Sequence, residues 1–261
     1  MRLLRKFSRS APEAVVAAHP PAAEARFASV ARTHNGAVRE LNEDRFVELP
    51  RAGLWAVADG MGGHQAGDVA AQMTADALVR VAAGSAAPTP GDVIEAAETV
   101  NSALLARCAS ANGGGTSGST LVSLLIDESG YTCIWVGDSR AYLFRDGRLT
   151  RISRDHSLVQ EMVDAGVLTP EQARNHPRAH VITRAIGVAD PIRLEAIAGS
   201  IEAGDIFLLC SDGLTGTLED SEIEAFLSAG ELIPAADAML AASLEKHARD
   251  NVTLVLVEAV G

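Results

Sequence analysis

Five aspartates of this 261-residue chain stand at the borders of short extended or apolar runs, where their carboxylates could bind a hard cation. Three lie beside a glycine just after a run rich in Val, Leu and Ile, and two lie just before a run. In chain order they are Asp44, Asp59, Asp138, Asp212 and Asp250. Carboxylate and carbonyl oxygens suit Mg²⁺ or Mn²⁺ better than zinc. If folding gathers these aspartates, their repulsion is costly unless cations neutralise it.

The Asp-Gly pairs also have a second interpretation, as turns. A single Asp-Gly pair after a strand is more often a turn than a ligand, because both residue types favour turns. Composition and spacing alone leave turn and ligand open.

Gly113, Gly115 and Gly118 match the spacing of a dinucleotide-binding fingerprint, but that site needs a strand before the glycines and a helix after them. Here a helical pattern comes first and an apolar run follows, so we interpret these glycines as a loop.

The residues around the aspartates resemble the metal-dependent PPM family of protein serine/threonine phosphatases, the type 2C class, in its bacterial form. The matching segments run in the family's order, and a chance match to all of them is implausible. They are Arg39–Asp44 (RELNED), Ala58–His64 (ADGMGGH), Gly115–Ser117 (GTS), Val136–Arg140 (VGDSR), Arg154–Ser157 (RDHS), His176–Pro177 (HP), Ile182–Gly187 (ITRAIG), Leu209–Leu214 (LCSDGL) and Arg249–Thr253 (RDNVT).

The resemblance implies an α+β fold, a four-layer αββα sandwich with two central, mostly antiparallel sheets and the metals at one end. It also implies two ions, Mn²⁺ or Mg²⁺, that activate a water to hydrolyse phosphoserine or phosphothreonine, with a possible third ion. The implied ligands are Asp59 bridging both ions, Asp212 and Asp250 on one ion, the carbonyl of Gly60 on the other, Glu43 and Asp44 through bound water, and Asp138 with Asp212 at the third site.

Two further roles concern the substrate. Arg39 stands where the family has its phosphate-binding arginine, and a planar guanidinium can pair with two phosphate oxygens. The leaving oxygen of serine or threonine needs a proton from a general acid. Eukaryotic relatives carry a histidine directly after the Asp-Gly pair, whereas this chain has Met61 there. His64 is the candidate acid, with a metal-bound water and a purely structural histidine as alternatives. We interpret His156 as structural.

The resemblance extends to substrate access and partners. Residues 153–190 look like the family's flap beside the active site, and lids of this kind control access. The segments Arg32–Gly36, Val38–Asp44 and Gly53–Trp55 also resemble phosphatases paired with a kinase in bacterial type VI secretion regulation. The expected partner is a phosphorylated protein, a Ser/Thr kinase or its target. Two alternatives are a phosphatase of small phosphoesters and a non-catalytic metal-binding signalling module of the same fold.

Composition restricts the class of protein. The net charge of −12 argues against nucleic-acid binding, which needs a basic face. No apolar run is long enough for a membrane span, and the basic start, Met1–Ser10, lacks the apolar core of a secretory signal. Cys108, Cys133 and Cys210 are far apart and odd in number. We therefore expect reduced thiols in a cytoplasmic protein.

Apolar runs and turn residues predict the strands that must position the aspartates. Residues 1–26 are basic and then rich in Ala and Pro, which is typical of a disordered tail. We expect one domain from 27 to 261. Strands are expected at 53–58, 119–126, 131–136, 206–210 and 252–257. Several are apolar on both alternating faces, so both faces of their sheets should be covered.

Helical periodicity appears between these runs. Apolar residues at three- and four-residue steps predict helices over 67–81 and 92–108, and a shorter one over 157–165. Thr169, with Pro170 and Gln172, predicts a capping-box start, and Ser221 with Glu224 predicts another. A last helix is expected over 234–246. Alternating blocks of strands and helices predict a layered α and β domain.

Overall fold

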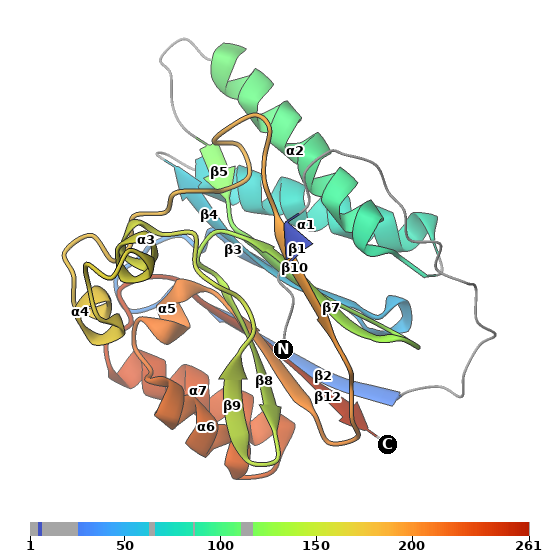
Figure 1. Cartoon of the computed structure of the whole chain (residues 1–261), viewed down its shortest axis with the longest axis vertical. Coiled ribbons are helices and arrows are strands. Elements are labelled where there is room, and N and C mark those ends of the chain that lie inside the picture. The colour runs from blue at the N-terminus through green and yellow to red at the C-terminus, as the bar shows by residue number, and fades with distance from the viewer. Residues whose placement is uncertain (1–4, 7–25, 63–65, 86, 111–116, 261) are drawn as a thin grey trace.

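Two antiparallel sheets form the centre of the molecule (Figure 1). The computed structural model describes residues 5–6, 26–62, 66–85, 87–110 and 117–260. The first sheet has the order β1-β10-β7-β6-β4-β3, with β5 paired to β4, and the second has the order β2-β12-β11-β8-β9. The first contains β1 (Arg5–Lys6), β3 (Asp44–Leu49), β4 (Leu54–Gly62), β5 (Ser117–Ser119), β6 (Leu121–Asp127), β7 (Gly130–Val136) and β10 (Glu195–Gly199). The second contains β2 (Arg26–His34), β8 (Arg140–Arg145), β9 (Arg148–Arg151), β11 (Ile206–Cys210) and β12 (Val252–Val260).

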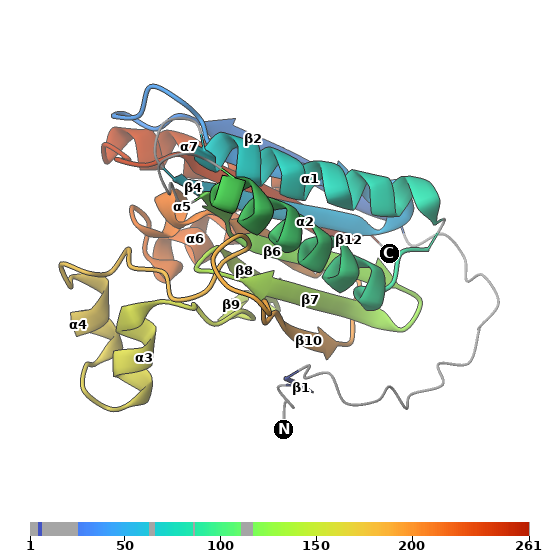
Figure 2. The same cartoon turned by 90° about the horizontal axis from the view of Figure 1, so that it is seen from above.

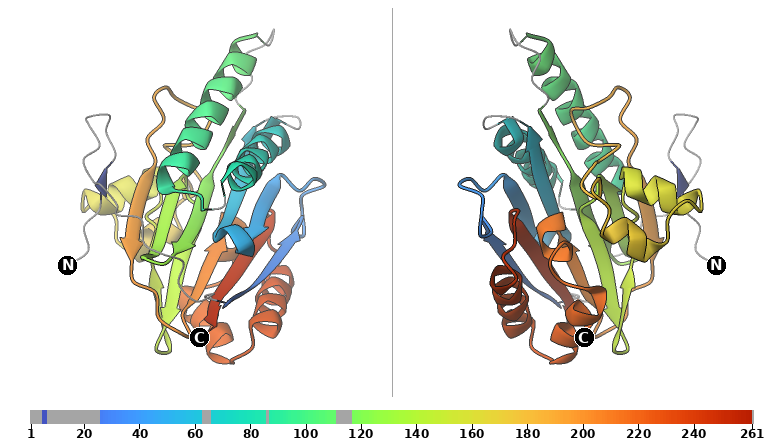
Figure 3. Two further views of the ribbon diagram at one scale, coloured as in Figure 1. Left: turned by 90° about the vertical axis from the view of Figure 1, so that its right-hand side faces the viewer. Right: turned by 90° about the vertical axis from the view of Figure 1, so that its left-hand side faces the viewer.

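Helices cover the outer face of each sheet, which gives the four layers of the expected αββα sandwich (Figure 3). The first sheet is covered by α1 (Ala66–Gly84) and α2 (Pro90–Ser110), and the second by α6 (Asp220–Ser228) and α7 (Leu232–Glu245). Three short helices, α3 (Leu158–Asp164), α4 (Pro170–Arg174) and α5 (Asp212–Thr215), lie outside these layers, and η1 (Pro50–Ala52) precedes β4. Figure 2 shows α3 and α4 together at one end of the sandwich.

Side chains of the central strands are buried on both faces, as the sequence predicted. In β7, Cys133 and Trp135 pack between the sheets, whereas Ile134 and Val136 pack under α1 and α2. Strand β11 divides its side chains in the same way between the other sheet and the helices beyond it. Successive side chains of a strand point to opposite faces, so a continuous apolar run is what a sheet covered on both faces requires.

The predicted helices and strands are present, but several boundaries differ: the run 119–126 is divided between β5 and β6, and β12 continues to Val260. The capping box at Thr169 is confirmed, since its side chain accepts from Gln172 N–H and Gln172 reciprocates. The start of α6 is wrong by two residues, because the N-cap is Glu219, which forms its own capping box with Glu222. Serine is preferred over glutamate as an N-cap, so the sequence by itself favours Ser221.

Strands with mixed polarity did not stand out in the sequence. β2, β8, β9 and β10 carry charged or small residues whose partners are far away in the chain. Arg145 of β8, for example, donates to Asp205 and to Glu202 at 2.6 Å. Of the predicted tail, Arg5–Lys6 forms β1 beside β10, and residues 1–4 and 7–25 lie outside the described residues. No described helix combines the length and apolar composition needed to cross a membrane.

Candidate metal centre

Pairing of β3 with β4 places two of the predicted ligands opposite each other. Asp44, the first residue of β3, is the register partner of Asp59 in β4. Thr120 holds Asp59 on both sides: its Oγ1 accepts from the Asp59 N–H at 2.9 Å, and its N–H donates to the Asp59 carbonyl at 2.8 Å. The predicted end of this strand at residue 58 is wrong, because β4 continues to Gly62 and its last residues pair with β5.

Asp212 and Asp250 come from the second sheet. Asp212 begins α5 two residues after β11 ends, and Asp250 lies two residues before β12. A Cβ on Gly213 would lie 2.0 Å from the carbonyl oxygen of Asn251, so only glycine lets the two loops approach this closely. Burial raises the pKa of Asp212 to about 6, and the charge of Asp250 is the next largest contribution to this shift.

Asp138 joins the group from the turn after β7. Gly137 before it has a φ of +107° and packs against Thr120, where an added Cβ would lie 2.6 Å from the threonine methyl. Asp138 is only 6% exposed. Its pKa is raised well above the usual carboxylate range, by burial first and then by the charge of Asp212.

Asp59 lies within reach of the charges of the other four aspartates. Burial of Asp59 is the largest cause that raises its pKa, and the charges of the other members follow: Asp44, Asp212, Asp138 and Asp250. Burial also raises the pKa of Asp44 to about 7, although Ser211 Oγ donates to its Oδ2 at 2.8 Å. Residues that are far apart in the sequence therefore meet where both sheets end, as the resemblance implied.

Divalent cations fit this donor set. Asp44 Oδ1 and Asp138 Oδ1 are buried, and neither has a hydrogen-bond partner among the described residues. A buried acceptor without a partner is costly, and hard cations bind such oxygens. Among the described residues, no three acidic, histidine or cysteine side chains already form a closed coordination set. The carboxylates would therefore have to rotate toward bound ions.

Glu43 and Gly60 lie beside the cluster in roles that help to build it. Glu43 Oε1 accepts from the Asp68 N–H at 3.3 Å in the first turn of α1, which favours a negative charge. The Glu43 carbonyl accepts from the Gly60 N–H at 3.2 Å. An added Cβ on Gly60 would lie 2.2 Å from the Gly67 carbonyl oxygen, so the strand and the helix approach closely here. The metal-binding roles of Glu43 and Gly60 stay predictions.

Arg39 reaches the cluster from the loop between β2 and β3. Its Nη2 lies 2.7 Å from Asp250 Oδ2, and the side chain is 52% exposed. The hydrogen bond to Asp250 is the largest cause that raises the pKa of this guanidinium. A charged, exposed guanidinium beside the carboxylates is placed to meet a phosphate that arrives from solvent. His64, the candidate acid, lies outside the described residues.

A cavity of about 520 Å³ opens beside Asp138 and Asp212. Helices α3 and α4 line one side of it, through Val159 and Ala173 among others, and Arg140 lines another. These helices belong to the expected flap, residues 153–190, and Figure 1 shows them next to α5. The cavity would give a substrate room beside the carboxylates.

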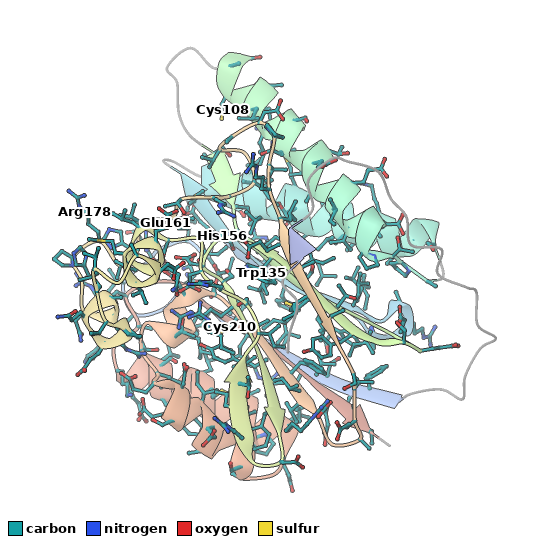
Figure 4. The ribbon with its side chains drawn as sticks, in the orientation of Figure 1. Cys108, Trp135, His156, Glu161, Arg178 and Cys210 are labelled. Carbon is teal, nitrogen blue, oxygen red and sulfur yellow. The ribbon has the colours of Figure 1, made fainter. Side chains whose placement is uncertain are left out.

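Two contacts behind Asp138 were not foreseen in the sequence. Arg140 Nη2 lies 2.8 Å from Asp155 Oδ2, and His156 Nδ1 accepts from the Gly137 N–H at 3.1 Å. The imidazole also stacks on the ring of Trp135, and both residues are labelled in Figure 4. His156 is 5% exposed, which supports its structural interpretation. Arg140 and His156 both lie in segments that match the family, and this match is the only sequence signal that points to them.

Comparison with known proteins identifies relatives of the chain. The family model described as protein phosphatase 2C matches residues 33–256. A serine/threonine phosphatase, stp, of Listeria welshimeri is 34% identical over 236 residues, which are 87% of this chain and 94% of the relative.

Solved structures agree with this match. PppA, a key regulatory component of T6SS in Pseudomonas aeruginosa, superposes with a TM-score of 0.80 at 39% identity, over 89% of this chain and 97% of that one. The catalytic domain of the serine/threonine protein phosphatase PstP, in complex with two manganese ions, gives 0.79 at 35% identity, over 90% and 99%.

Proposed function

This chain belongs to the protein phosphatase 2C family, and from that premise we propose that it removes phosphate from phosphoserine and phosphothreonine in proteins, using the aspartate cluster. The enzyme is a metal-dependent serine/threonine protein phosphatase that uses Mn²⁺ or Mg²⁺. The single observation that carries the assignment to these residues is the convergence of five carboxylates from both sheets, so that the charges of the other four raise the pKa of Asp59.

The proposed ligands divide the work between the two sheets. Asp59 would hold both ions from the first sheet, and Asp212 with Asp250 would hold one of them from the second. The Gly60 carbonyl would bind the other ion, Glu43 and Asp44 would act through water, and Asp138 with Asp212 would hold a third ion. When bound, a pair of divalent cations supplies a water of lowered pKa as the nucleophile and offsets the charge of the phosphate.

The remaining steps belong to side chains outside the ligand set. Arg39 binds two non-bridging oxygens of the phosphate and stabilises the charge that spreads over them in the transition state. Arg39 must exchange its contact with Asp250 for the substrate. His64 is proposed to donate a proton to the leaving oxygen.

A metal titration tests the proposed chemistry. We expect EDTA to abolish hydrolysis of a phosphothreonine peptide and Mn²⁺ to restore it, because the carboxylates bind the cations that supply the nucleophile. Full activity in metal-free buffer would contradict the proposal. Small phosphoesters belong in the same assay: a much higher kcat/KM for them than for phosphopeptides would favour the small-molecule alternative. Metal binding without turnover of any substrate would favour a signalling module.

The substrate class follows from the flap and the relatives. We treat residues 27–261 as one phosphatase domain in which the flap, 153–190, covers the cavity beside Asp138 and sets substrate preference. The phosphorylated partner is proposed to be a Ser/Thr kinase or its target, and the likeness to PppA supports a role in secretion control. The three unpaired cysteines support a reducing compartment, the cytoplasm.

A further inference from the structure

Asn251 uses both N–H groups and the carbonyl oxygen of its side chain to hold the loop that carries Arg39. Its Nδ2 donates to the carbonyls of Asn35, at 3.1 Å, and Leu41, at 2.9 Å. Its Oδ1 accepts from the Glu43 N–H at 2.8 Å. The residue is 5% exposed, so water cannot readily replace these bonds.

The same loop is also fixed at its start. Ala37 N–H donates to the Ala248 carbonyl at 2.7 Å. Gly36, at a φ of +79°, packs so closely that an added Cβ would lie 2.1 Å from the Asp250 carbonyl oxygen. Asn35 Nδ2 bonds within the loop to the Glu40 carbonyl at 3.0 Å. Loop 35–43 is thus tied to segment 248–251 on both sides of Arg39.

The side chain of Arg39 is held much less firmly than its backbone. It is 52% exposed and its ion pair is with Asp250. A long side chain of this kind has about 2 kcal/mol of rotamer entropy, so its reach to a phosphate depends on where the backbone starts it. Displacing a binding group by about 1 Å can cost 100-fold in rate.

We propose that Asn251 is a positioning residue for phosphate binding, which sets the distance between Arg39 and Asp250 by bracing loop 35–43. This inference rests on the proposed phosphate role of Arg39. The side chain of Asn251 takes no part in holding Asp250, because the Asp250 Oδ1 contact at 2.9 Å comes from the backbone N–H of Asn251. Removing the side chain therefore loosens the phosphate contact and leaves the metal ligand in place.

The variant Asn251→Ala tests this in Mn²⁺-saturated enzyme. We expect about a tenfold rise in KM for a phosphothreonine peptide and in the inhibition constant of inorganic phosphate. The Mn²⁺ dissociation constant should change by less than about threefold, and any fall in kcat should be smaller than the rise in KM, because Arg39 contacts the phosphate in the ground state as well as in the transition state. Asn35→Ala removes one bond inside the loop and should raise KM in the same direction by a smaller factor. If Asn251→Ala does not fold, a KM equal to wild type in Asn35→Ala overturns the inference.

Asn101→Ala is the matched control. Asn101 is 1% exposed, and its side chain bonds to the Ala189 carbonyl at 3.0 Å and the Gly187 N–H at 2.7 Å. A comparable loss of buried hydrogen bonds should here leave the inhibition constant of phosphate unchanged. An equal rise in both variants would mean general loosening of the fold, and would overturn the inference.

A double-mutant cycle with Arg39→Ala separates the positioning role of Asn251 from the phosphate-binding role of Arg39. If Asn251 acts through Arg39, the double variant should have nearly the KM of Arg39→Ala alone. KM effects that multiply overturn the positioning role. A rise in KM for Arg39→Ala without one for Asn251→Ala overturns the positioning role and leaves the proposed function intact. An unchanged KM in Arg39→Ala overturns both.

Discussion

At the residue scale, metal binding and stability oppose each other at this centre, because the carboxylates that bind cations repel one another when no cation is bound. Asp44 and Asp138 are buried and Asp59 is half-buried, and desolvation is the largest cause that raises the pKa of each carboxyl. Natural cores seldom keep such groups unless they serve a site. Stability and activity should therefore respond in opposite directions when one of these charges is removed.

Asp212→Asn should separate the two responses. Loss of contacts behind a metal ligand already costs about 10–100-fold, so loss of the ligand itself should lower kcat by about 100-fold or more. The melting temperature of the metal-free protein should stay equal or rise, because one repelling charge is gone. Circular dichroism and a phosphopeptide assay measure both quantities. An active variant would remove Asp212 from the site.

The pH dependence of stability follows from Asp44. Its pKa is about 7 in the folded protein and 3.8 ordinarily. Between these values the folded protein keeps a proton that the unfolded chain loses, so this contribution to stability is complete below about pH 4 and is lost as the pH rises through about 7. We expect the difference in melting temperature between wild type and Asp44→Asn, measured in EDTA, to become less favourable to wild type from pH 5 to pH 8.

Saturating Mn²⁺ provides the control for that measurement, since bound cations favour the charged carboxylate. The trend with pH should then flatten or reverse in wild type. A melting-temperature difference in EDTA that is independent of pH would show that Asp44 titrates normally in the fold.

At the scale of elements, the site depends on close approach of loops that leave β11 and precede β12. Gly213 lets the first turn of α5 contact the Asn251 carbonyl, and Ser211 N–H donates to the Thr253 carbonyl at 3.0 Å beside it. The second sheet thus delivers Asp212 and Asp250 as one unit. Strand pairing of β3 with β4 delivers Asp44 and Asp59 as another.

Gly213→Ala should disturb the first of these units. The new methyl group meets backbone rather than a movable side chain, and overpacking of this kind costs about 1–3 kcal/mol. We expect a lower melting temperature and weaker Mn²⁺ binding, measured by calorimetry. Gly84→Ala, at the end of α1 with nothing within 4 Å of an added Cβ, should change neither. Equal metal affinity in Gly213→Ala and wild type would count against the close-approach argument.

For the whole molecule, the centre lies where the two sheets end together, so bound cations should tie the sheets to each other. Ligand at 100 times its dissociation constant stabilises a fold by about 2.7 kcal/mol, and each kcal/mol raises the melting temperature of a domain this size by about 2–4 °C. We therefore expect Mn²⁺ to raise it by roughly 5–10 °C.

Trp55 and Trp135 are buried between the sheets, so their fluorescence should change in the same unfolding transition as the circular dichroism signal. If Mn²⁺ shifts the melting temperature measured by fluorescence but not the one measured by circular dichroism, or the reverse, the sheets unfold separately.

Much of this protein was determined by sequence alone. Buried strands such as β11 and β7 were predictable because apolar runs must be covered on both faces, and α2 was predictable from its apolar periodicity. The matched segments also identified the family and the five aspartates, since chemistry restricts residue type at those positions. Local pattern sufficed wherever a short stretch of chain decides its own state.

Tertiary structure alone decided how those residues meet. Folding places Asp59 inside β4 and brings the Glu43 side chain within hydrogen-bond distance of the first turn of α1. It also bonds the Asn251 side chain to the loop that carries Arg39. It also formed β2 and β8, whose polar side chains find partners in distant segments. These outcomes depend on side-chain hydrogen bonds between residues up to 220 positions apart, and no local propensity encodes the distance between two side chains that only folding brings together.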